Sequence, residues 1–332
     1  MNTPKCDELD YIHFLVAAQK VFSNTEAAKC HPQARNNGPA HDAYTRLLHR
    51  CQSYGEALWQ EVKECISLEG GMLILDDSTL DKQYARVMEL VTRHWSGKHH
   101  RVVMGINLIS LLWTSGHNHW PCDFRIYDKL NDGLNKNDHF VDMLNTAAKR
   151  GFKPELVAFD SWYSSLENLK MVRSKKWHWL TRLKSNRLVD PDGSGNRPIS
   201  EILISRDGTI VHLKGYGFIK VFKIVAKNGD IEFWSTDILN MTIWQCAEYA
   251  EYSWQIEVYH HDLKQYCGVE RAQHRSGVAQ RNHIGLAIRA FLRLESHRVR
   301  TGVSFFDAKA SIVRDAIRSY LTNPLYVKIS TA

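Results

Sequence analysis

Two short apolar runs of this chain each end in acidic residues. Residues 73–75, Leu-Ile-Leu, lead to Asp76 and Asp77, and residues 156–159, Leu-Val-Ala-Phe, lead to Asp160. The carboxyl ends of neighbouring strands are where open α/β sheets place their sites. Taken singly, each Asp is more typical of a turn or a helix cap. A third acid on an adjacent helix would favour a metal site.

Glu257 is the candidate for that third acid. It belongs to a helical pattern in which His260 and Lys264 follow three and seven residues later, so all three lie on one helix face. The alternative for Glu257 is a surface glutamate paired with a neighbouring histidine. Carboxylate oxygens are the ligands that Mg²⁺ prefers, so the residue types favour divalent-cation chemistry.

The surrounding patterns predict the elements that would position these acids. Apolar runs and turn residues predict strands, and amphipathic spacing with breaks at Gly151 and Pro154 predicts helices between them. The resulting β-β-β-α-β-α-β order fits an α/β fold with a mixed sheet flanked by helices. The predicted strands are 72–75, 102–113, 120–127, 156–159 and 177–183, and the predicted helices are 138–150 and 165–174.

The remaining segments complete a four-part organisation. Helices over 7–22 and 41–69 predict a helical N-terminal unit, residues 1–68, before the first part of the core, residues 69–184. Short β-rich runs between turns predict an antiparallel β insertion over residues 185–240, with strands at 209–213, 218–226 and 231–236. Helical pattern resumes at Ile243, so residues 241–325 are expected to hold the helical remainder of the core and basic C-terminal helices.

Composition and charge narrow the class of protein. The 332 residues are 44% hydrophobic and 24% charged, which excludes a disordered or fibrous chain. No membrane span, basic leader or Cys-x-x-Cys pair is apparent, so a cytoplasmic protein with reduced thiols is expected. The net charge of +7 equals that of residues 271–322, which hold nine Arg and one Lys against three acids. Such a segment suits phosphate binding, and the alternative is a solvated helical face.

Several sequences of this chain resemble the DDE transposases of the insertion-sequence-four type, and more specifically its seven-oh-one branch. They are residues 73–79 (LILDDST), 93–98 (RHWSGK), 159–168 (FDSWYSSLEN) and 279–285 (AQRNHIG), with Lys264 seven residues after Glu257. The resemblance implies a ribonuclease-H-like core interrupted by the β-rich insertion. It also implies that Asp76, in preference to Asp77, joins Asp160 and Glu257 as the catalytic residues. These three acids would bind two Mg²⁺ ions, with Mn²⁺ as a substitute.

The implied activity is that of a DNA transposase of an insertion sequence. It would cleave at the element ends and transfer the 3′-hydroxyl into target DNA, which suggests a nucleoid-associated enzyme. Its partners would be double-stranded DNA, as terminal inverted repeats and target, and a second copy of the chain on paired ends. The N-terminal unit would recognise the element ends. The expected phosphate contacts are Lys264, His260, Arg271, Arg275 and Arg281.

This chain departs from the resemblance at two positions. The broader type carries Tyr seven residues and Arg four residues before its Glu, where this chain has Ala250 and Ser253. A DNA hairpin assisted by aromatic residues of the insertion is known in that type, and Trp234 is the candidate equivalent in this chain. Two other functions stay open: a metal-dependent DNA nuclease on the same fold, and a DNA-binding protein whose acids are inert.

Overall fold

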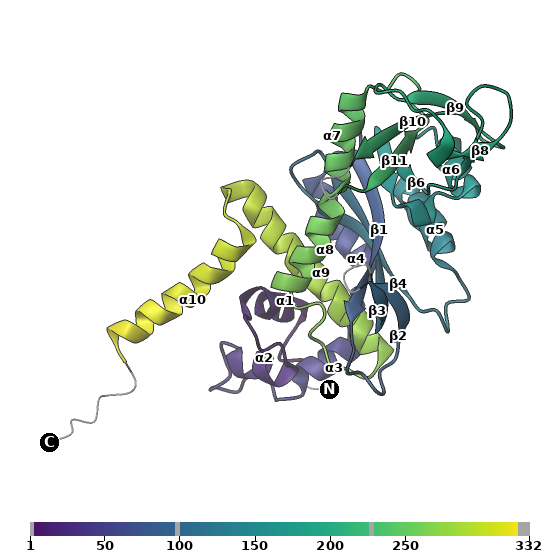
Figure 1. The fold of residues 1–332 in the computed structure, drawn as a ribbon. Coiled ribbons are helices and arrows are strands. Elements are labelled where there is room, and N and C mark those ends of the chain that lie inside the picture. Colours follow the sequence, from purple (N-terminus) through teal and green to yellow (C-terminus); the bar gives the residue numbers. More distant parts are fainter. Residues whose placement is uncertain (1–2, 97–99, 226–228, 325–332) are drawn as a thin grey trace. The chain divides into compact units, whose positions relative to one another are not determined.

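The computed structural model describes residues 3–96, 100–225 and 229–324 (Figure 1). Parts of four predicted segments lie outside these ranges: residues 1–2 of the N-terminal unit, residues 97–98 of the motif at 93–98, Ala226 at a strand end, and residue 325. The chain divides into two compact units. One is Tyr54–His260, and the other combines the described parts of residues 1–53 and 261–332. This division differs from the predicted four-part organisation, because the N-terminal helices pack with a segment distant in sequence.

A mixed sheet is the centre of the unit Tyr54–His260, as the sequence predicts. In the described residues it has nine strands in the order β2-β3-β1-β5-β6-β11-β10-β9, with β4 also pairing β3. β1 is parallel to β5 and β5 to β6, whereas the other pairs are antiparallel. The run β4-β3-β1-β5-β6 is the strand order of a ribonuclease-H-like core. The strands are β1 Met72–Asp81, β2 Thr92–Ser96, β3 Arg101–Thr114, β4 Trp120–Tyr127, β5 Leu156–Phe159, β6 Trp179–Leu183, β9 Thr209–Leu213, β10 Gly217–Val225 and β11 Ile231–Thr236.

The predicted β insertion extends this sheet. Strands β9, β10 and β11 form an antiparallel meander whose last strand, β11, pairs with β6 of the core. Two further short strands, β7 Leu188–Val189 and β8 Arg197–Pro198, form a separate hairpin. The insertion therefore brings residues of β11 next to the end of a core strand.

Helices cover the sheet on both faces (Figure 1). α5 Lys136–Lys149 and α6 Leu166–Ser174 lie on one side, and α7 Ile243–Ser253 and α8 Gln255–Tyr266 begin on the other. Both α5 and α7 start with a capping box, from Asn135 and Thr242, so side chains satisfy their first backbone N–H groups.

The single helix predicted over residues 41–69 is wrong. The structure has α3 Ala43–Arg50 and α4 Gly55–Val62, followed by the short 3-10 helix η1 Lys63–Cys65. Tertiary contacts accompany the break between α3 and α4. The N–H of Ser53, between the two helices, donates to the Asn282 side chain at 3.0 Å, and a Cβ on Gly55, the first residue of α4, would overlap the Asp123 carboxylate. Periodicity alone carries no signal of such contacts.

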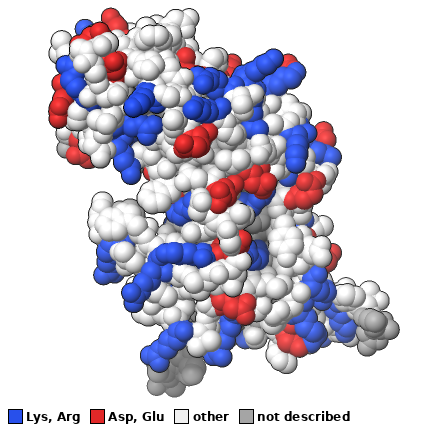
Figure 2. All heavy atoms as spheres, turned by 90° about the vertical axis from the view of Figure 1, so that its right-hand side faces the viewer, with Lys and Arg blue, Asp and Glu red and all other residues white. Residues whose placement is uncertain are grey.

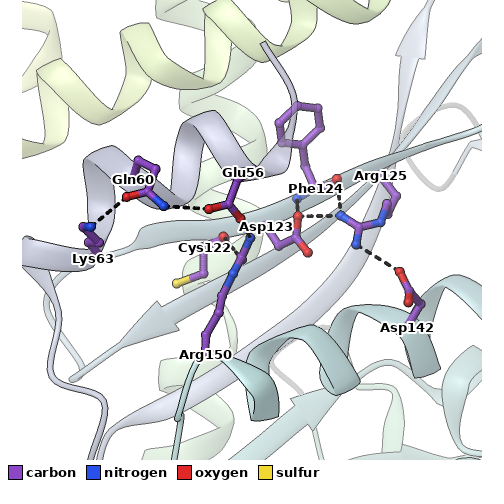
Figure 3. A network of polar contacts seen from close by, with 9 residues as sticks. All are labelled: Glu56, Gln60, Lys63, Cys122, Asp123, Phe124, Arg125, Asp142 and Arg150. Atoms are coloured by element: carbon purple, nitrogen blue, oxygen red, sulfur yellow. Dashed lines mark hydrogen bonds and ion pairs between the residues drawn. The ribbon is translucent and has the colours of Figure 1, made fainter. Parts of the chain in front are cut away.

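A polar network fixes α4 and α5 against β4 (Figure 3). Arg125 Nη1 donates to Asp123 at 2.5 Å, and its Nη2 donates to Asp142 of α5 at 3.0 Å. Arg150 donates to the Cys122 carbonyl at 3.0 Å and to Glu56 of α4 at 3.1 Å. These contacts hold the helices on the strands.

The second unit is built around α9 Gly277–Thr301, which is largely buried from its start to Glu295. α1 Glu8–Ala17, shorter than the predicted 7–22, packs on it together with α3 and α10 Phe305–Thr322, and α2 Asn24–Cys30 packs on α3 and α1. Tyr11 contacts His283 at 3.0 Å, and Asn282 donates to the Leu48 carbonyl at 2.9 Å. In the described residues, no helix of either unit is long and apolar enough to cross a membrane.

Candidate active site

Four polar or aromatic side chains form one row across the sheet. The last parallel pairs are Leu75 with Phe159 and Phe159 with Thr181, so the next residue on each of these adjacent strands belongs to the row. The residue after Thr181 is Arg182, which is in turn paired with Trp234 of β11. Side chains in one row of a sheet point to the same face, so the four share a surface. The row consists of Asp76, Asp160, Arg182 and Trp234.

The strand end predicted at Asp76 needs correction. β1 continues through Asp76 and Asp77 to Asp81, because its antiparallel pairing with β3 runs from Met72 to Asp81. Only its parallel pairing with β5 stops at Leu75. The strand end predicted before Asp160 is thus the end of β5. The one predicted before Asp76 is only the end of the parallel pairing between β1 and β5. Asp76 and Asp160 are neighbours all the same.

A cavity of about 280 Å³ opens over this row. Asp76, Asp160 and Glu257 all line it, so the structure brings the three predicted acids to one cavity. Glu257 is in the first turn of α8. The remaining lining residues are Ile74, Leu75, Ala158, Phe159, Arg182, Ile224, Glu232, Trp234, Ala247, Ala250, Ser253, Trp254 and Ile256.

Electrostatic repulsion is concentrated on Asp76. Burial raises the pKa of this carboxyl well above its usual value, and the nearby charges of Asp77, Asp160 and Glu257 raise it further, in that order. Burial and like charges both disfavour the ionised form of a carboxyl. A bound cation would reverse the repulsive contribution.

Asp77 has a different environment, because adjacent residues of a strand point to opposite faces. Its carboxylate accepts hydrogen bonds from Lys136 at 2.6 Å, Asn107 at 2.7 Å and Tyr163 at 2.8 Å. Burial alone would raise the pKa of Asp77, but Lys136, Asn107 and Tyr163 lower it overall. Asp77 therefore serves a structural ion pair with α5.

Arg182 is the functional candidate that the sequence interpretation missed. Its guanidinium donates to Glu232 at 2.9 Å, lies 3.5 Å from Asp160, and is 5.8 Å from the centre of the Trp234 ring. Burial alone would lower its pKa, but Asp160 and Glu232 raise it, so the group stays charged. The signal in the sequence is its place near the end of an apolar run that follows the strand ending at Asp160.

Trp234 is not an exposed aromatic platform in this arrangement. The residue is 8% exposed, and its indole N–H donates to Glu232 at 2.8 Å. Its ring lies under Arg182. Trp254, by contrast, lines the same cavity and is 63% exposed.

The predicted phosphate contacts do not line this cavity. His260 is buried at 4% exposure, which disfavours a direct phosphate contact. Lys264 belongs to the other unit, where it lies 3.7 Å from Glu270. Arg271 and Arg275 are exposed in that unit, and Arg281 is half-buried.

The basic C-terminal segment is partly neutralised by ion pairs. Arg289 pairs with Glu8, Arg298 with Glu295 at 2.6 Å and Arg318 with Asp315 at 2.6 Å. Figure 2 draws a face of the molecule that is not limited to this segment, and there too Lys and Arg are mixed with Asp and Glu. The number of arginines in this segment therefore overstates the positive charge that is left for DNA.

The three carboxylates fit a hard divalent cation by donor type and by their shared cavity. As the side chains stand, no group of three His, Cys, Asp or Glu within the described ranges is close enough to hold a metal ion. Asp160 accepts from the Ser161 N–H and lies 3.5 Å from Arg182.

Comparison with known families matches residues 73–293 to the family described as Transposase DDE domain. The chain belongs to this family, and the matched range contains Asp76, Asp160 and Glu257.

The solved structures that match this chain include two transposases. The piggyBac transposase synaptic complex with hairpin DNA is 13% identical, with a TM-score of 0.48, over 96% of this chain and 73% of that chain. The Drosophila P element transposase strand transfer complex is 10% identical, with a TM-score of 0.27, over 99% of this chain and 68% of that chain. A search of curated proteins found no match.

Proposed function

We propose that this chain is the transposase of an insertion sequence of the insertion-sequence-four type, seven-oh-one branch. It cleaves DNA at the element ends and joins the freed 3′-hydroxyl to target DNA. The observation that carries the proposal is the shared cavity: Asp76, Asp160 and Glu257 come from three separate segments and line it together within the matched transposase range.

In this proposal Asp76, Asp160 and Glu257 hold two Mg²⁺ ions, or Mn²⁺ in their place. Such ions activate the attacking oxygen and stabilise the leaving oxygen of a phosphodiester. The raised pKa of Asp76 supports this role, because a carboxyl crowded by other acids gains most from a nearby cation.

Arg182 binds a phosphate of the reacting strand. Among the described residues that line the cavity, it carries the positive charge, and its planar guanidinium suits phosphate oxygens. Glu232 and the Trp234 ring hold it in place, which limits the entropy lost when DNA binds. Ala250 and Ser253 line the same cavity, so Arg182 supplies a charge that α7 does not.

Trp254 contacts the DNA at the mouth of the cavity, and the N-terminal helices recognise the element ends. Two copies of the chain act on paired ends. The support for Trp254 is its exposure of 63% beside the three acids. Aromatic side chains stack on unpaired bases.

The test uses the purified full-length chain and linear DNA carrying the inverted repeats that flank its gene. With Mg²⁺, the wild type is expected to produce joined strand-transfer products, and Asp160→Asn none while still binding the DNA. Cleavage without joining would identify a nuclease. Binding without cleavage by the wild type would identify an inert DNA-binding protein, and either result would overturn the proposal.

A further inference from the structure

Ser110 occupies the position on β3 directly opposite Asp76. The antiparallel register pairs these two residues, so their side chains lie on the same face of the sheet. Directly opposite residues of an antiparallel pair have Cβ atoms roughly 5 Å apart. Ser110 thus extends the row of Asp76, Asp160 and Arg182 by one strand.

The Ser110 hydroxyl is buried and unsatisfied. The residue is 0% exposed, and its Oγ has no hydrogen-bond partner in the described structure. A buried hydroxyl without a partner costs stability, and alanine at this position would avoid that cost. An orphaned polar group in a native fold calls for an explanation such as a functional partner.

The other polar side chains of this buried strand support that interpretation. Residues 105–114 of β3 are all buried. Asn107 donates to Asp77 at 2.7 Å, and Thr114 accepts from the Gly116 N–H at 3.0 Å. Asn107 therefore supports one acid of β1, and Ser110 stands opposite the other.

We propose that Ser110 is the positioning residue for Asp76. Its hydroxyl donates a hydrogen bond to the ionised Asp76 carboxylate when that carboxylate turns toward a divalent cation. This inference rests on the proposed function. It explains why a hydroxyl is placed at a dry position in the sheet, since residues that hydrogen-bond to metal-binding carboxylates fix their orientation.

The test compares the full-length wild type with Ser110→Ala by two measurements. Mn²⁺ alone is titrated by calorimetry, and the melting temperature is recorded in EDTA. The expected result is that Mn²⁺ affinity falls by about tenfold, as for other residues that support metal ligands. The melting temperature in EDTA is expected not to fall, because the variant loses no hydrogen bond of the metal-free protein.

Thr114→Val is the matched control, since Thr114 is equally buried on the same strand and face and does have a partner. This variant is expected to melt at a lower temperature with unchanged Mn²⁺ affinity. Equal Mn²⁺ affinity in Ser110→Ala and the wild type would overturn the role of Ser110 and leave the proposed function standing. Absence of Mn²⁺ binding by the wild type would overturn both.

Discussion

The guanidinium of Arg182 lies 3.5 Å from the carboxylate of Asp160, and both residues come one position after the pair Phe159–Thr181. In a cavity that also holds Asp76, Glu232 and Glu257, this arginine is the counter-charge to the acids. Asp160 thus has a cationic partner in the metal-free protein. Under the proposed function, metal binding and DNA binding would be coupled, because a cation bound to Asp160 would free an Arg182 donor for phosphate.

Replacing Arg182 is expected to weaken the productive DNA complex. Arg182→Gln should reduce strand transfer about 10- to 100-fold, since the loss of a charge-assisted phosphate contact removes about 1.5–3 kcal/mol. The plot of the logarithm of the DNA-binding constant against the logarithm of salt concentration should also become less steep by about one unit, because one fewer phosphate is neutralised. The control is Arg197→Gln, because Arg197 has similar exposure, 44% against 43%, and a comparable ion pair with Asp192. Equal effects of the two variants would contradict a special role for Arg182.

Asp76→Asn is expected to stabilise the metal-free protein. The folded-state pKa of Asp76 is raised, so its contribution to stability is fully present below its unfolded pKa of about 4 and is lost as pH rises through the folded pKa. The Asn side chain does not ionise, so the variant does not lose folding stability as pH rises. Its melting temperature in EDTA should exceed that of the wild type by roughly 2–4 °C at pH 8, with a gap that shrinks toward pH 4. A gap that widens at low pH would contradict the assignment.

Asp77→Asn should have the opposite effect. It breaks the ion pair with Lys136 and weakens the bonds from Asn107 and Tyr163, so a loss of about 3 kcal/mol in the free energy of unfolding is expected. Chemical denaturation in EDTA measures this loss. The two adjacent variants would thus differ in sign, and a stabilising Asp77→Asn would show that the ion pair is unimportant.

The short strands that hold Asp160 and Arg182 can be predicted from the sequence, because buried parallel strands are continuous apolar runs. The choice between Asp76 and Asp77 cannot, since a strand buried on both faces shows no alternation. The register with β5 and β3 decides which of the two lies in the row of Asp160, and register is a property of pairing between distant segments. The role of Arg182 depends on the same register and on Trp234, which comes from the insertion.

The motif at residues 279–285 has a structural role. Asn282 bonds to Ser53 and Leu48, and a Cβ on Gly285 would overlap the Ser53 carbonyl. Gly285→Ala is therefore expected to destabilise the second unit by several kcal/mol, as overpacking against a fixed backbone does. Thermal unfolding measures this effect. An unchanged melting temperature would mean that the residues near Ser53 are free to move aside.

The predicted helix over 41–69 shows the limit of periodicity. Its apolar spacing is real and produces both α3 and α4, yet the break between them depends on Asn282 and Asp123, which lie far along the chain. The phosphate contact predicted at His260 stays a prediction, and its sequence signal has a related limit. Its spacing from Glu257 places both on a common helix face, but burial of His260 is decided by what packs on that face.

The most direct test of the three-acid site is the melting temperature of the full-length chain in EDTA and in saturating Mn²⁺, since a cation that binds the folded state raises it. The wild type is expected to melt higher with Mn²⁺, and Asp76→Asn, Asp160→Asn and Glu257→Gln are each expected to lose that rise. Asp192→Asn, an exposed acid on the loop between β7 and β8, should keep it. An equal rise in the wild type and all three site variants would contradict a shared cation at Asp76, Asp160 and Glu257.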